Sequence, residues 1–216
     1  MIEQHFKEEL ARATRLFWKK ELTPGQDSGD LSIRDPETGL IYICPRPNET
    51  LMIPNWGVIT AEDMVVMDID GNLMEDSGIL ATVEAPTHLH IYRARPNVRA
   101  IIHSHAVWSS AFAVAGRNIP LVLAEQALFL GGEIICAEYG KVGSEKLAEN
   151  MTRALGQDKM AVLMRNHGAV CVGESMDEAF IVSDFLEKGA QTTLLAHLIA
   201  TPIEISPDDI LDDSLL

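Results

Sequence analysis

The first residues of the chain place apolar side chains at the spacing of one helical face. Ile2, Phe6, Leu10, Ala13 and Phe17 follow one another at intervals of four, four, three and four residues, which is the period of an amphipathic helix. The Thr-Pro-Gly sequence that follows is typical of a helix end. We therefore expect an N-terminal helix with one buried face.

Short apolar runs between turn sequences predict β-strands further along. The turn sequences include Asp-Pro, Pro-Arg-Pro and Asp-Gly-Asn, which interrupt regular structure. The predicted strands cover residues 31–34, 40–44, 50–53, 64–68, 100–105, 134–136, 161–164 and 170–172. The last two flank Asn166-His167-Gly168, which predicts a tight hairpin.

Further helices are predicted between these strands. They cover residues 82–95, 107–115, 125–130, a segment that begins at Ser144, and 176–200. The sequence Gly140-Lys141-Val142-Gly143-Ser144 lacks the spacing of a P-loop and is interpreted as the start of a helix. Hairpins interleaved with helices favour a mixed or mostly antiparallel sheet flanked by helices. We expect one domain over residues 1–201 and an acidic tail over residues 202–216.

Composition and charge narrow the possible functions. The 216 residues are 47% hydrophobic and 23% charged, with 17 Lys and Arg against 32 Asp and Glu, a net charge of −15. This is a globular composition, and its negative charge argues against a nucleic-acid partner. Three cysteines without close spacing favour a reducing compartment. With no signal peptide and no apolar run long enough to span a bilayer, we expect a cytoplasmic protein.

Three histidines occupy positions that suit a metal centre. His103 and His105 lie two residues apart on a predicted strand, so their side chains project from the same face. His167 lies in the predicted hairpin turn at an end of the sheet. Three imidazoles with an open fourth position are the ligand set of a catalytic zinc site. The alternative is that each histidine is an ordinary core or surface residue, because an isolated His-x-His pair is a weak signal.

Glu84 and His88 lie in the predicted helix over 82–95. His88 and His90 form a second His-x-His pair, but residues two apart do not share a helical face. Glu84 lies four residues before His88 and so shares its face. A carboxylate beside a divalent cation can act as a ligand, a base or an acid. The alternative is a first-turn acid that interacts with the helix dipole.

The order and spacing of five motifs resemble the class II aldolase/adducin family, which includes sugar-phosphate aldolases and epimerases. The resemblance covers about residues 29–200, and the motifs are Gly29-Asp30-Leu31-Ser32-Ile33-Arg34, Glu84-Ala85-Pro86-Thr87-His88 with Arg95-Pro96, Ile102-His103-Ser104-His105, Ile119-Pro120 and Arg165-Asn166-His167-Gly168. It implies a three-layer α/β/α sandwich with a largely antiparallel central sheet. It also implies a homotetramer with active sites at the subunit interfaces.

The same resemblance assigns roles to the residues above. It implies that His103, His105 and His167 bind Zn²⁺, with Mn²⁺ or Co²⁺ as alternatives, and that Glu84 is the catalytic carboxylate. His88 then has a structural role. The implied activity is a lyase that cleaves a C–C bond of a small hydroxy-carbonyl or sugar-phosphate-like substrate through a metal-bound enediolate, whose charge the ion stabilises.

The chain departs from the family where sugar-phosphate members hold the phosphate. The matching positions are Gly29-Asp30, Asn55-Trp56 and Thr82-Val83. Asp30 would place a carboxylate beside a phosphate, which is a like-charge contact, and Val83 lacks a hydroxyl donor. We keep as substrate-binding candidates Gly29, Asp30, Asn55, Trp56 and Thr82.

A second departure concerns the acid that protonates the leaving aldehyde. Related aldolases use a tyrosine of the C-terminal tail, whereas Tyr42, Tyr92 and Tyr139 all precede the tail of this chain. Glu125 is the candidate for this role, and an exposed helix carboxylate is the alternative interpretation.

Three other functions stay open. The altered phosphate positions favour a metal-dependent decarboxylase of a hydroxy acid as the nearest alternative. A sugar-phosphate 4-epimerase would share the cleavage step and rejoin the fragments. A non-catalytic, adducin-like structural module would need no metal at all.

Overall fold

The computed structural model describes residues 1–24, 28–46 and 56–206. Their strands are β1 (Asp30–Arg34), β2 (Ile41–Ile43), β3 (Val65–Met67), β4 (Ala100–Ser104), β5 (Cys136–Ala137), β6 (Ala161–Met164) and β7 (Gly168–Gly173). They form one sheet in the order β3-β2-β1-β4-β7-β6-β5. Only the β5–β6 pair is parallel among these strands. The expected largely antiparallel sheet is confirmed.

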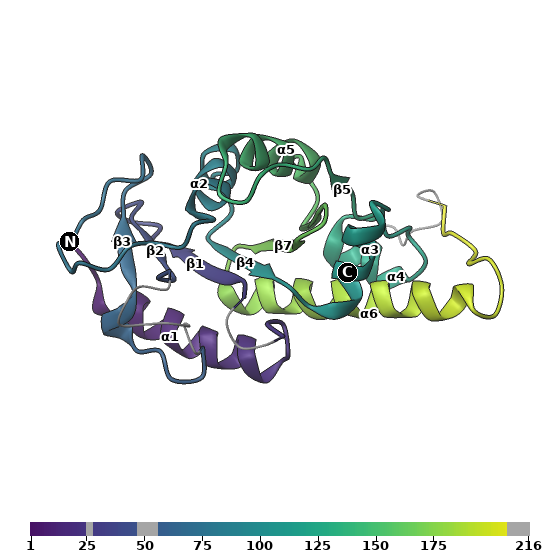
Figure 1. The fold of residues 1–216 in the computed structure, drawn as a ribbon, viewed down its shortest axis with the longest axis horizontal. Helices are drawn as coiled ribbons and strands as arrows, with labels where there is room; N and C mark the ends of the chain where they lie inside the picture. Colours follow the sequence, from purple (N-terminus) through teal and green to yellow (C-terminus); the bar gives the residue numbers. More distant parts are fainter. Residues whose placement is uncertain (25–27, 47–55, 207–216) are drawn as a thin grey trace.

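Helices cover both faces of this sheet (Figure 1). One face carries α1 (Gln4–Lys19), α3 (Val107–Ala115), α4 (Ala124–Leu130) and α6 (Met176–His197). The opposite face carries α2 (Ala85–Ala94) and α5 (Glu145–Leu155). The structure is therefore the three-layer α/β/α sandwich that the family resemblance implies.

Two hydrophobic cores follow from the alternation of side chains along the strands. On β4, Ile102 packs in the core beneath α1 and α6, and the neighbouring Ile101 packs in the core beneath α2 and α5. Both side chains are fully buried, because successive residues of a strand point to opposite faces. The predicted N-terminal helix fits this scheme, since Leu10 and Phe17 from its apolar face are fully buried in the first core.

The start of α2 differs from the prediction. The helix predicted to begin at residue 82 begins at Ala85, and Glu84 immediately precedes it. The Thr82 hydroxyl accepts a hydrogen bond from the Glu84 main-chain N–H at 3.3 Å, a local side-chain bond that competes with helix formation. Glu84 is therefore the N-cap residue of α2 rather than a residue inside it. Its side chain and that of His88 make separate contacts.

Other boundaries differ by a few residues. The strand predicted over 134–136 is β5 at Cys136–Ala137, and α6 ends at His197 rather than at residue 200. A short 3-10 helix, η1 (Ala61–Asp63), was not predicted. The strand predicted over 50–53 lies outside the described residues, as do residues 207–216 of the predicted tail. At the described start of that tail, Ile205 N–H donates to Leu121 O at 2.8 Å.

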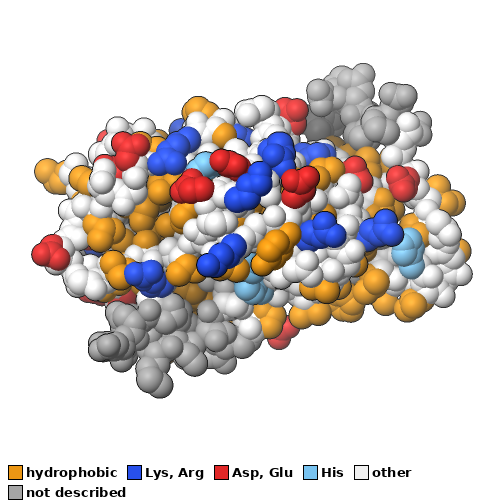
Figure 2. Space-filling model, turned by 45° about the horizontal axis from the view of Figure 1, so that its top comes forward, with side chains coloured by type: hydrophobic (Ala, Val, Ile, Leu, Met, Phe, Trp, Pro, Cys, Tyr) orange, Lys and Arg blue, Asp and Glu red, His pale blue; other side chains and the backbone are white. Residues whose placement is uncertain are grey.

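The surface on the α2–α5 side carries mixed charges. Figure 2 brings this side forward and shows Lys and Arg side chains interleaved with Asp and Glu. None of the helices in residues 1–24, 28–46 and 56–206 has the length and hydropathy needed to cross a membrane.

Candidate metal centre

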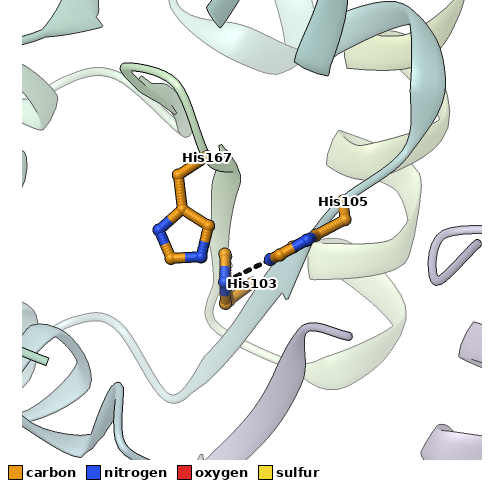
Figure 3. A group of neighbouring side chains, drawn as sticks. All are labelled: His103, His105 and His167. Atoms are coloured by element: carbon orange, nitrogen blue, oxygen red, sulfur yellow. Dashed lines mark hydrogen bonds between the residues drawn. The ribbon is translucent and has the colours of Figure 1, made fainter. Parts of the chain in front are cut away.

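The three predicted metal ligands converge where β4 ends beside the β6–β7 turn (Figure 3). His103 belongs to β4, His105 follows the end of that strand, and His167 belongs to the turn. The ring centroids lie 4.8 Å apart in each of the three pairs. His103 Nε2 and His105 Nε2 are 3.1 Å apart. One ligand atom from each ring lies within 4.8 Å of the others, so the rings form a single cluster.

Two glycines allow the backbone to approach the histidine segments closely. A Cβ atom at Gly168 would lie 2.2 Å from the carbonyl oxygen of Ser104, and one at Gly29 would lie 2.4 Å from the carbonyl oxygen of His103. Real Cβ atoms do not come so near a carbonyl oxygen, so a larger residue would push these segments apart. The glycines of the Asn-His-Gly and Gly-Asp motifs thus keep β7 and the start of β1 against the metal centre.

The protonation of the rings suits metal binding. His103 Nδ1 lies 3.0 Å from the carbonyl oxygen of Ala169, so Nδ1 carries the proton and Nε2 is free to bind an ion. Burial lowers the pKa of His103, and it lowers the pKa of His105 to about 3 and that of His167 to about 4. All three rings are therefore neutral at pH 7, the form that a metal requires.

This donor set fits a divalent transition metal. Three neutral imidazole nitrogens suit Zn²⁺ and similar ions, whereas Mg²⁺ and Ca²⁺ prefer oxygen ligands. Among the described residues, the cluster contains the three histidines and no carboxylate. A three-histidine set leaves a coordination position for a small molecule. The residues present therefore fit a catalytic ion.

The histidines line a cavity of about 250 Å³. Four of the predicted substrate-binding residues line it with them: Gly29, Asp30, Trp56 and Thr82. Asn55 lies outside the described residues. The remaining described lining residues are Ser28, Pro45, Arg46, Val83, Glu84 and Val142. The structure thus brings the predicted ligands, the predicted catalytic carboxylate and most of the predicted substrate positions to one cavity.

Glu125 lies elsewhere in the chain. Its Oε1 accepts a hydrogen bond from Lys188 Nζ at 2.6 Å, across the contact between α4 and α6. Glu125 does not line the cavity of its own chain. Its described contacts match the alternative interpretation, a carboxylate on a helix surface.

The Glu84 side chain is held at both carboxylate oxygens. Oε1 accepts a hydrogen bond from the Gly143 main-chain N–H, and Oε2 accepts one from the Thr87 hydroxyl, both at 3.1 Å. Burial raises the pKa of Glu84, and the negative charge of Asp30 raises it further. A raised pKa near a metal centre suits a group that exchanges protons with a ligand.

The Asp30 carboxylate lies in the cavity wall and contacts two neighbouring side chains. Thr82 Oγ1 donates to Asp30 Oδ2 at 2.5 Å, and His88 Nε2 lies 2.8 Å from Asp30 Oδ1. Burial opposes the charge on Asp30, but the contacts with His88 and Thr82 outweigh it and lower the pKa to about 2. Asp30 is therefore an anion at neutral pH, and His88 contacts this anion rather than the metal-binding rings.

Two parts of the cavity were missed by the sequence analysis. Residues 140–144 were interpreted only as the start of a helix, yet Val142 lines the cavity and Gly143 holds Glu84. Arg46 was considered only as part of a Pro-Arg-Pro turn. The glycine spacing of residues 140–143 was the available signal for the first, and no local pattern pointed to the second.

Comparisons with known proteins agree with this geometry. Residues 8–194 match the model of the Class II Aldolase and Adducin N-terminal domain. A protein of Methanocaldococcus jannaschii named L-fuculose phosphate aldolase is 30% identical over 193 residues, which is 89% of this chain and 98% of the relative. A 5-deoxy-D-ribulose 1-phosphate aldolase of Bacillus thuringiensis is 29% identical over 209 residues, covering 97% and 93% of the two chains.

A solved structure supports the same relationship. The structure of an L-fuculose 1-phosphate aldolase matches with a TM-score of 0.89 and 29% identity, and the match covers 97% of this chain and 94% of that one. The family model alone matches most of the chain. The chain therefore belongs to the class II aldolase and adducin N-terminal domain family.

Proposed function

We propose that this protein is a zinc-dependent lyase of the class II aldolase type. It would cleave a C–C bond of a small hydroxy-carbonyl or sugar-phosphate-like substrate. The observation that carries the proposal is the meeting of three neutral imidazoles and one buried carboxylate, Glu84, at a single cavity. The aldolase names of the relatives support it.

Glu84 is the proton-transfer group in this proposal. A divalent ion at the three histidines supplies a Lewis acid that polarises a carbonyl group and stabilises negative charge. Glu84 exchanges a proton with the carbon that loses its partner when the C–C bond breaks. The bonds from Gly143 and Thr87 hold its carboxylate in one orientation, and a fixed orientation is what efficient proton transfer needs.

The assay for this function is C–C cleavage by zinc-loaded protein, with aldehyde release as the readout. Suitable substrates are ketose 1-phosphates and the corresponding free ketoses. Glu84→Gln keeps the shape of the side chain and removes its acid–base function, so we expect it to retain zinc and to lose at least about a hundredfold in kcat. Undiminished cleavage by Glu84→Gln would remove Glu84 from the mechanism.

A decarboxylase of a hydroxy acid is the second candidate, and the cavity gives it a specific argument. Arg46 lines the cavity and is a natural partner for a substrate carboxylate. Thr82, a substrate-binding candidate at one of the positions that hold the phosphate in sugar-phosphate members, already donates its hydroxyl proton to Asp30. Release of CO₂ from a panel of hydroxy acids would distinguish this candidate from the aldolase.

The proposal includes a cytoplasmic homotetramer with active sites at subunit interfaces. In support, Val107, two residues after His105, is an apolar side chain that is 62% exposed, and Trp18, which lines a separate cavity together with Val107, is 42% exposed. Light scattering of the purified protein tests the assembly. In a tetramer, the predicted role of Glu125 requires that α4 of one subunit faces the cavity of its neighbour.

A further inference from the structure

Asp30 and His88 form a buried pair in the wall of the metal cavity. Asp30 is 3% exposed and His88 is fully buried. Asp30 Oδ2 accepts the hydrogen bond from Thr82 Oγ1 at 2.5 Å, and Asp30 Oδ1 lies 2.8 Å from His88 Nε2. Thr82 thus donates to one carboxylate oxygen and the His88 ring lies beside the other, an arrangement that stabilises an anion.

The hydroxyl groups of Ser32 and Tyr92 continue this series of contacts from the other ring nitrogen of His88. Ser32 Oγ lies 2.7 Å from His88 Nδ1 and 2.8 Å from the hydroxyl oxygen of Tyr92. Ser32 lies on β1, whereas His88 and Tyr92 lie on α2, and all three are buried. The buried ring has Ser32 at Nδ1 and Asp30 beside Nε2, so His88 is a positioning residue for the Asp30 carboxylate.

This arrangement changes what the cavity can bind. The Thr82 hydroxyl is directed to Asp30, and the Glu84 oxygens accept bonds from Gly143 and Thr87. Among the described lining residues, the acids are Asp30 and Glu84, and Arg46 is the one Lys or Arg. A doubly charged phosphate would meet a fixed anion here, and like charges brought together in a desolvated site oppose binding. The single positive charge of Arg46 matches the single negative charge of a substrate carboxylate better than the double charge of a phosphate.

We propose that Asp30, held by Thr82 and His88, is a specificity-determining residue that excludes phosphate groups from this cavity. The substrate is then an unphosphorylated hydroxy-carbonyl compound or hydroxy acid. This substrate class differs from the phosphorylated compounds for which the two aldolase relatives are named. The inference rests on the proposed lyase function of the same cavity.

The test compares two probes with the same chelating group. Glycolohydroxamate and its phosphate ester, phosphoglycolohydroxamate, are titrated calorimetrically into the full-length, zinc-loaded protein. We expect the wild-type protein to bind the unphosphorylated probe at least as tightly as the ester. Asp30→Asn removes the charge at nearly constant shape, and we expect it to shift the ratio of the two dissociation constants toward the ester by at least about tenfold.

Two further variants isolate the cause. Asp35→Asn removes a charge from another buried aspartate, which does not line the cavity, and we expect it to leave the ratio unchanged. Thr82→Val removes a donor but keeps the Asp30 charge, so it should still disfavour the ester and provides a second measurement if Asp30→Asn does not fold. A wild-type preference of tenfold or more for the ester, or the same shift in Thr82→Val as in Asp30→Asn, would overturn the proposal.

The outcomes also separate this inference from the proposed function. Tight binding of both probes with a preference for the ester overturns the exclusion of phosphate and leaves a metal-dependent lyase in place. Binding of neither probe to protein of verified zinc content overturns the lyase function, and the role of Asp30 with it.

Discussion

The main-chain N–H of Gly143 donates to Glu84 Oε1 at 3.1 Å, and only glycine fits at this position. Gly143 has a φ of +70°, and a Cβ atom there would lie 2.7 Å from the carbonyl oxygen of Val83. The loop before α5 therefore packs directly on the segment that carries the catalytic candidate. This contact links a glycine distant in the sequence to the orientation of one carboxylate.

Replacing Gly143 should impair catalysis more than metal binding. In Gly143→Ala, the new Cβ forces the loop away from Val83 and weakens the bond to Glu84. We expect kcat to fall at least about tenfold, because small misplacements of a proton-transfer group are costly, while zinc content stays unchanged. Steady-state kinetics and metal analysis measure both quantities.

Gly156→Ala is the matched control for this variant. Gly156 also has a positive φ, +62°, but a Cβ atom there has no neighbour within 4 Å. Both variants place an alanine at a positive φ, which strains the backbone by about 1–3 kcal/mol, and only Gly143→Ala disturbs Glu84. Equal losses of activity in the two variants would assign the effect to general destabilisation.

The Thr87 hydroxyl provides a second, independent test of the same carboxylate. Thr87→Val removes the donor to Glu84 Oε2 and keeps the side-chain shape. We expect a several-fold lower kcat with little change in KM, because the lost contact orients Glu84 rather than the substrate. Thr87→Ser restores a hydroxyl and should recover most of the rate; failure of this rescue would argue for a packing role.

Arg46 should affect ligands according to their charge. Arg46→Gln removes the one described Lys or Arg of the cavity lining. We expect binding of carboxylate-bearing inhibitors such as tartronate to weaken about five- to tenfold, equivalent to about 1–1.4 kcal/mol. Binding of uncharged hydroxy-ketones should not change. Calorimetry on both ligand types measures the difference, and an equal loss for both would exclude a charge-specific role.

The metal-free protein should lose stability on mild acidification. The pKa values of His105 and His167, about 3 and about 4, lie below the ordinary value of 6.5 because the rings are buried. The unfolded chain therefore binds more protons than the folded one, and the free energy of unfolding falls as the pH drops from about 6.5 toward 4. Urea titrations at several pH values should show this slope. His167→Gln should make it shallower, and an unchanged slope would contradict the assigned pKa.

The layers of the fold and the histidine cluster could be predicted from the sequence because both depend on local patterns. Alternation along a strand predicts that His103 and His105 share a face, and the Asn-His-Gly turn predicts where His167 lies. The Gly143–Glu84 and His88–Asp30 contacts were not accessible, because each joins segments that meet only through the packing of α2 against α5 and of α2 against the sheet. The start of α2 was misplaced because the Thr82 hydroxyl accepts from the Glu84 N–H, and helical periodicity contains no information about that bond.

The most direct test of the central claim is the zinc content and C–C cleavage activity of the wild-type protein and of His103→Ala, measured side by side. The three-histidine centre predicts about one zinc ion per wild-type chain, with metal and cleavage lost together in His103→Ala. Cleavage that persists in zinc-free His103→Ala protein would contradict a lyase built on these three rings.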